Sequence, residues 1–220
     1  MRRLLLLLAV VGLWLTPIGV TAADSGFTVR QCSDRIEITC DGHPVAQYVF
    51  RDERIIRPYF CDVRAPGGIQ VTRNHPPLPG KYATDHDTLH QGLWLAFGDI
   101  NGQDFWRNKG RMEHVRFIEP PQVEKAQLTF ATESLLRATD GKSVCSLTNR
   151  FTLRQMANAW LLVWEASFRS EDGDVTFGDQ EEMGFGARRD GHHGEERRRH
   201  HQQFRVEKRE EHLGPAGRVV

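Results

Sequence analysis

The sequence predicts an all-β fold, a β-sandwich, and three observations carry this prediction. Short runs rich in β-branched and aromatic residues recur along the chain, each bounded by Gly, Pro, Asp or Asn. No helical period extends over a window of about 12 residues. Many short strands at close spacing are typical of a sandwich or barrel, and 220 residues suit one such domain.

The first two predicted strands, 27–29 and 36–38, alternate apolar and polar residues. The Asp41-Gly42 pair predicts the turn into the next strand. The later segments are continuous apolar or β-branched runs bounded by turn residues. In chain order they are 45–50, 58–63, 69–72, the strongly apolar 92–97, 115–118, 127–132, 146–153 and 160–168.

Charge and motifs argue against several classes of function. Lys plus Arg and Asp plus Glu both number 29, so no global charge attracts nucleic acid or acidic lipid. Basic residues are not interleaved with aromatic ones in a stripe, which argues against a nucleic-acid partner. The sequence holds no P-loop, Gly-x-Gly-x-x-Gly, Gly-x-Ser-x-Gly or His-Glu-x-x-His motif. Nucleotide-binding, α/β-hydrolase and standard metalloprotease functions are therefore disfavoured.

Residues 1–22 have the pattern of a secretory signal peptide. Arg2 and Arg3 form a charged start, and an apolar run from Leu4 to Leu15 follows. This run is too short to span a membrane, and no later apolar segment is long enough. We expect an exported protein, periplasmic or extracellular, with no transmembrane span after cleavage; an uncleaved anchor is the alternative. The expected organisation is a signal peptide over 1–22, a sandwich domain over 23–187 and a tail over 188–220.

Export makes disulfides possible, and four cysteines follow the predicted signal peptide. Cys32 and Cys40 flank a predicted hairpin and could pair, whereas a small buried hydrophobe is the alternative role for each cysteine. Their spacing contains no Cys-x-x-Cys, so it is not a metal-binding pattern. The pairing stays open among Cys32, Cys40, Cys61 and Cys145.

The densest polar cluster lies between residues 73 and 107. His86 and His90, four residues apart beside two aspartates, could act as acid or base near neutral pH. Together with His75 and a carboxylate they could instead ligate a metal, although the spacing matches no closed zinc pattern. Nearby aromatic rings could stack on a sugar face; turn capping and core packing are the structural alternatives. The candidate binding residues of this cluster are Arg73, Asp85, Trp94, Asp99 and Trp106.

A second candidate segment runs from 175 to 188 and contains Asp179-Gln180-Glu181-Glu182 before Met-Gly-Phe-Gly. A partly buried Glu181 or Glu182 could serve as a general base because burial raises a carboxyl pKa. A solvated turn between strands is the alternative.

The chain changes character at about Arg188. The Arg- and His-rich run that follows offers no apolar residue over its first half, which predicts a solvated tail. Metal binding by the tail histidines, His192, His193, His200 and His201, is the second interpretation.

Multi-residue blocks over roughly residues 27–188 carry a family resemblance. They are Arg57-Pro58-Tyr59-Phe60, Ala65-Pro66-Gly67-Gly68-Ile69-Gln70-Val71-Thr72-Arg73, His75-Pro76-Pro77, Asp85-His86 to Trp94, Phe97-Gly98-Asp99-Ile100-Asn101-Gly102, Asp104-Phe105-Trp106 and Gly178-Asp179-Gln180-Glu181-Glu182-Met183-Gly184. In these blocks the chain resembles the PmoA-like family, secreted bacterial proteins of unknown function that carry the nominal label methane oxygenase.

This family is similar in architecture to galactose-mutarotase-like supersandwiches, which bind sugars in a concave sheet and use a His acid and a Glu base. The resemblance implies His86 or His90 as the acid and Glu181 or Glu182 as the base. It also implies that Arg73 and Asp85 orient sugar hydroxyls. A membrane methane oxygenase would need several spanning helices, and the sequence offers none.

The tail departs from the family pattern, in which more strands follow the Glu-Glu-Met-Gly block. We therefore expect a sandwich that is incomplete at its C-terminus, with residues 188–220 read out of frame or truncated.

Three hypotheses of function follow. The first is a carbohydrate-binding or carbohydrate-active protein with a saccharide ligand. The second is a metal-dependent oxygenase or oxidase that uses His75, His86, His90 and a glutamate. The third is a non-catalytic envelope interaction module. The sequence identifies no cofactor.

Overall fold

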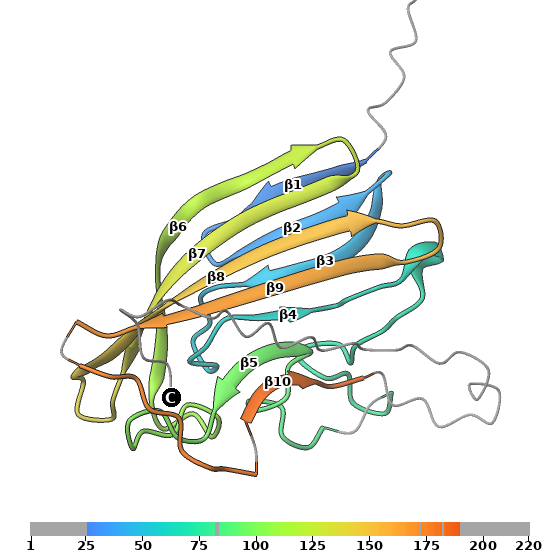
Figure 1. Cartoon of the computed structure of the whole chain (residues 1–220). Helices are drawn as coiled ribbons and strands as arrows, with labels where there is room; N and C mark the ends of the chain where they lie inside the picture. Colours follow the sequence, from blue (N-terminus) through green and yellow to red (C-terminus); the bar gives the residue numbers. More distant parts are fainter. Residues whose placement is uncertain (1–25, 82–83, 172, 182, 190–220) are drawn as a thin grey trace, which may run out of the picture.

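A computed structural model describes residues 26–81, 84–171, 173–181 and 183–189, which form two antiparallel β-sheets (Figure 1). The predicted signal peptide, Glu182 and the tail from residue 190 onward lie outside the described residues. Among the residues that are described, no helix is long and apolar enough to cross a membrane.

The first sheet has six strands and the second has four, so the predicted all-β sandwich is confirmed. The six-stranded sheet has the order β1 (Phe27–Gln31), β2 (Arg35–Cys40), β3 (His43–Val49), β4 (Tyr59–Cys61), β5 (Leu93–Phe97) and β10 (Met183–Ala187). The four-stranded sheet has the order β6 (Arg111–Glu124), β7 (Gln127–Arg137), β8 (Ser143–Gln155) and β9 (Trp160–Arg169). A 3-10 turn, η1 (Pro66–Gly68), lies in the long connection between β4 and β5.

The core between the sheets follows from the alternation of the strands. Ile36 and Ile38 on β2 point inward and are fully buried, as the sequence pattern predicts. Tyr48 on β3 lies in register with Phe60 on β4 and packs against Phe151 of the other sheet, with ring centroids 4.9 Å apart. Burial of each such side chain stabilises the fold by roughly 1.5–3 kcal/mol.

The opposite face of the six-stranded sheet is also covered. Tyr59, Trp94 and Ala96 point away from the inter-sheet core and belong to a second buried cluster. The cluster also contains loop residues that follow β3 and β5, such as Ile55 and Ile100, and side chains of the four-stranded sheet, which are Met112, Leu136, Cys145 and Leu147. Loops and the second sheet together therefore bury both faces of β4 and most of β5, which matches their continuous apolar sequence.

Two strand predictions are wrong. Segment 69–72 forms only isolated bridges, from Gln70 to Arg64 and from Thr72 to Arg189, and no ladder. It follows Gly67 and Gly68, whose positive φ angles turn the chain away from an extended course. Residues 183–187 form β10 although the sequence predicted no strand there, because two glycines lower the strand propensity.

All four cysteines lie among the described residues and are free thiols. Cys40 points into the inter-sheet core and is 2% exposed, whereas Cys32 lies between β1 and β2 and is half-buried. The alternative of a small buried hydrophobe therefore describes Cys40, Cys61 and Cys145.

Candidate functional site

A cavity of about 890 Å³ opens on the loop-covered face of the six-stranded sheet. Its floor includes Arg35 on β2, Gln47 on β3 and Tyr59 on β4, which share this face of the sheet. The loop after β3 and the long β4–β5 connection supply the walls, with Asp52 from the first and His75 from the second. Three adjacent strands and two loops thus build one polar pocket.

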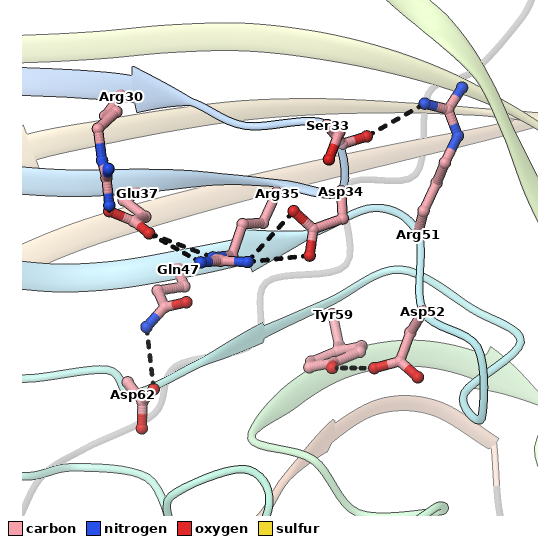
Figure 2. A network of polar contacts seen from close by, with 10 residues as sticks. All are labelled: Arg30, Ser33, Asp34, Arg35, Glu37, Gln47, Arg51, Asp52, Tyr59 and Asp62. Carbon is pink, nitrogen blue, oxygen red and sulfur yellow. Dashed lines mark hydrogen bonds and ion pairs between the residues drawn. The ribbon is translucent and has the colours of Figure 1, made fainter.

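Arg35 is held on the cavity floor by two carboxylates (Figure 2). Its guanidinium lies 2.9 Å from an Asp34 oxygen and 3.2 Å from an oxygen of Glu37. Arg30, on the neighbouring strand, donates to the same Glu37 carboxylate. These hydrogen bonds from Arg30 and Arg35 keep the pKa of Glu37 below its ordinary value, although its partial burial acts in the opposite direction. The arginine is therefore fixed and its charge is matched within the protein.

Asp52 and Tyr59 form the second polar pair of the cavity. The Tyr59 hydroxyl donates to Asp52 Oδ2 at 2.7 Å (Figure 2). Asp52 Oδ1 accepts hydrogen bonds from the backbone amides of Arg54 and Ile55. Burial acts to raise the pKa of Asp52, but these hydrogen bonds outweigh it and hold the pKa below its ordinary value. Burial and then the Asp52 carboxylate raise the pKa of Tyr59, so the phenol stays protonated.

His75 packs beside this pair. Its ring meets the Tyr59 ring edge to face, with centroids 5.3 Å apart and planes at 78°. Burial lowers the pKa of His75 below 6.5, although Asp52 acts to raise it. The imidazole is therefore neutral at pH 7. His75, considered in the sequence only as a metal ligand, is the one histidine that lines the cavity.

The predicted site residues Arg73, Asp85, His86 and His90 belong to the same β4–β5 connection as His75 but do not line the cavity. Arg73 is 2% exposed and donates to the backbone carbonyls of Asp85 at 2.9 Å and His90 at 2.8 Å. Arg188 donates to both oxygens of the Asp85 carboxylate, at 2.8 and 3.0 Å. Arg73 thus holds the loop backbone and does not present its guanidinium to solvent. This position does not fit the predicted role of Arg73 as a sugar contact.

His86 and His90 contact each other. Their ring centroids lie 5.1 Å apart, and His86 Nδ1 lies 3.0 Å from Asp85 Oδ2. The His90 ring stacks on Trp94 at 5.1 Å with planes at 15°. Burial first, then the positive charges of His86, Arg188, Arg57 and Arg73, lower the pKa of His90. This surrounding of arginines does not favour a bound cation.

The two predicted sugar-stacking tryptophans are core residues. Trp94 is 3% exposed and Trp106 is 8% exposed, and their rings pack against each other at 5.6 Å. The buried Arg57 lies over the Trp94 ring and donates to the carbonyls of Leu89, Phe105 and Trp106. Neither indole offers a free face to a ligand, because the loops that bury the outer face of the sheet need large apolar side chains beneath them.

The predicted acid and base are not brought together. β10 pairs with β5 so that Met183 lies opposite Phe97 and Ala187 opposite Leu93. Glu181 therefore lies beyond the Phe97 end of β5 and His90 beyond the Leu93 end, roughly 13 Å or more apart at the usual strand rise. Asp99 lies at the same end as Glu181, where its carboxylate accepts the Gly102 amide at 2.7 Å and caps a turn. Glu182 lies outside the described residues.

The predicted metal ligands are separated as well. His75 lies against Tyr59 in the cavity, whereas His86 and His90 form their own pair. Within the described ranges, no group of three or more His, Cys, Asp or Glu side chains is placed to hold a metal ion.

Sequence reasoning missed Arg35, Asp52 and Tyr59 as site residues. Asp52 caps an ordinary polar turn, and Arg35 begins a strand after another polar turn, so neither differs locally from a solvated surface residue. Tyr59 stood inside one of the blocks that carried the family resemblance, which is the only signal that could have pointed to it.

Comparison with known proteins gives one match. A model for a family described as a family of unknown function (DUF6807) matches residues 35–212, which include every strand from β2 to β10. No curated protein and no solved structure matches the chain.

Proposed function

This chain belongs to the DUF6807 family of unknown function, and we propose that it binds a neutral saccharide in the cavity on the loop-covered face of its six-stranded sheet. The observation that carries the proposal is the composition of that cavity. Its walls combine fixed charged groups, an amide and aromatic edges, and the positive and negative charges are equal in number.

The size and lining suit a sugar. A volume of about 890 Å³ lies within the range of pockets for small ligands. Gln47 and His75 supply hydrogen-bonding groups, and the His75 ring adds a flat surface beside them; sugars need both. Gln47 is anchored on Asp62, and His75 packs on the buried Tyr59, so these groups are already oriented before a ligand arrives.

The balance of charge favours a neutral ligand over an anionic one. A phosphate or carboxylate site usually presents arginines whose charges are not matched by the protein. Here Arg35 is paired with Asp34 and Glu37, and Arg54 lies 3.0 Å from Asp87. The lining as a whole carries three arginines and three carboxylates, which are Arg35, Arg51, Arg54, Asp34, Asp52 and Glu53.

The resemblance to the PmoA-like family implies a galactose-mutarotase-like sandwich, and this supports the same ligand class, because such folds bind sugars on a sheet. The proposal is one of binding. The residues that the resemblance implied as acid and base lie at opposite ends of β5, so their arrangement gives no support for a paired acid–base reaction.

The test is calorimetric titration of purified protein with glucose, galactose, mannose, N-acetylglucosamine, lactose and maltose, together with glucuronate and glucose 6-phosphate. We expect at least one neutral sugar to bind and to bind more tightly than the acidic sugars. Arg35→Gln should weaken this binding by about tenfold, since it removes a charged hydrogen-bonding group from the cavity floor.

Arg116→Gln is the matched control. Arg116 also lies on a strand and pairs with a glutamate, Glu133, at 2.7 Å, but it belongs to the four-stranded sheet. It should leave sugar binding unchanged. Failure of every neutral sugar to bind, or equal loss of binding in both variants, would contradict the proposal.

A further inference from the structure

We propose that His75 hydrogen-bonds the ligand inside the cavity, and that it donates this bond through Nε2. This inference rests on the proposed function and deepens it, because it names a side chain that contacts the saccharide.

Three of the other polar side chains that line the cavity are already engaged by the protein. Arg35 is bound by Asp34 and Glu37, and the Tyr59 hydroxyl donates its hydrogen bond to Asp52. The Gln47 amide nitrogen donates to Asp62 at 3.1 Å. These contacts orient the lining but leave fewer of its donors free for a ligand.

His75 differs from them. Its Nδ1 atom is enclosed and has no hydrogen-bond partner in the described structure. A ligand in the cavity cannot reach an enclosed atom, so Nε2 is the nitrogen through which this ring can meet one. A neutral imidazole carries one proton, and placing it on Nε2 avoids burying an unpaired N–H donor at Nδ1.

The ring is also held in place for this role. The edge-to-face contact with Tyr59 fixes one side of the imidazole, and the Asp52 carboxylate fixes Tyr59 in turn. Thr88, from the same long connection, also lines the cavity. A hydroxyl or ring oxygen of a saccharide is the acceptor that a fixed Nε2–H donor would recognise.

Two amide substitutions distinguish the two ring nitrogens. The side-chain amide of Gln extends about as far as Nε2 of histidine, and that of Asn about as far as Nδ1. We expect His75→Gln to retain sugar binding within about threefold. His75→Asn and His75→Ala should each weaken it by roughly five- to tenfold, the loss expected for one hydrogen bond.

The measurement is calorimetric titration with the sugar of the panel above that binds the wild-type protein most tightly. His43→Gln and His43→Ala, at an exposed histidine on β3, are the matched controls and should bind as wild type does. Thermal unfolding of every variant verifies that it folds. NMR of 15N-labelled wild-type protein reads the tautomer of His75 directly, and we expect the proton on Nε2.

The outcomes are distinguishable. If the wild type binds a sugar but all three His75 variants bind equally well, or if Asn rescues binding and Gln does not, this inference is overturned and the proposed function stands. A proton on Nδ1 overturns it with or without ligand. If the wild type binds no sugar, the proposed function fails and this inference falls with it.

Discussion

Trp94 on β5 and Gly186 on β10 lie in register, and the indole fills the space that a side chain at position 186 would need. A Cβ atom added at Gly186 would lie 2.2 Å from the Trp94 Cε2 atom. This close approach explains why a glycine stands in the middle of a strand that its low propensity would otherwise disfavour.

Gly186→Ala should therefore destabilise the protein, by about 2–3 kcal/mol, because three indole ring atoms must move in a packed region. Chemical denaturation measures this loss. The double variant of Gly186→Ala and Trp94→Phe, in which part of the indole is removed, should lose less stability than the sum of the two single substitutions. Strict additivity would show that the ring does not set the requirement for glycine.

Arg57 should be a structural residue, and its replacement should destabilise the fold. It is 3% exposed and donates to the carbonyls of Leu89, Phe105 and Trp106, so it ties two loops to the outer face of the sheet. Burial lowers its pKa to about 10, so it stays charged at pH 7.

We expect Arg57→Met to lower the free energy of unfolding by about 2–4 kcal/mol, because three carbonyls lose a charged donor. Arg57→Lys should not restore it, since an ammonium cannot span the three acceptors. Urea denaturation is the measurement. Arg116→Met removes an exposed ion pair and should cost under about 1 kcal/mol. Similar losses of stability at Arg57 and Arg116 would contradict the structural role of Arg57.

Tyr48 and Thr132 join the two sheets through one buried hydrogen bond of 3.2 Å between their hydroxyls. Tyr48→Phe leaves the buried Thr132 hydroxyl without this partner and should cost about 1–2 kcal/mol. Adding Thr132→Val should recover part of that loss, because no unpaired polar group then remains. A double-mutant cycle by denaturation tests this, and a double variant less stable than the sum of the singles would contradict it.

His114 should make stability depend on pH. Burial, and then the charge of Arg51, lower its pKa from 6.5 to about 4, and its ring packs against Phe50 and Phe117. Since the unfolded chain binds the proton more readily, stability is complete above pH 6.5 and falls as pH drops toward 4.

We expect His114→Phe to reduce this fall by on the order of 1 kcal/mol, the ring being partly solvated. Denaturation midpoints at several values between pH 4 and 7 measure the slope. His75 and His90, whose pKa values are also lowered by burial, leave a residual dependence. An equal slope in wild type and His114→Phe would rule out His114 as the origin of the pH dependence.

The local sequence pattern was sufficient to predict the strands in which one face is buried and the other is polar. The alternation of Ile36 and Ile38 with polar residues predicted both the strand and its buried face. The local pattern failed where a residue is required by a side chain on the neighbouring strand. In β10, Gly186 is explained by the Trp94 ring on β5. Segment 69–72 shows the reverse, because a strand-like composition formed no ladder without a partner strand.

The candidate site was predicted only in part for a related reason. The sequence pointed to Arg73, Asp85, His86 and His90, and the structure does bring them together. Their proximity follows from short separations along the chain. Glu181 was predicted as a general base from its acidic run and from the family resemblance, and the antiparallel pairing of β5 and β10 places it at the other end of the strand.

The sequence by itself determined that this protein is all-β, since period and turn residues act over a few neighbouring positions. Only the tertiary structure decided that Arg35, Asp52, Tyr59 and His75 share one cavity. These residues come from β2, β4 and two loops, and their meeting depends on which strands pair and in which register. Register is fixed by the packing of both sheet faces over long separations, which no local pattern encodes.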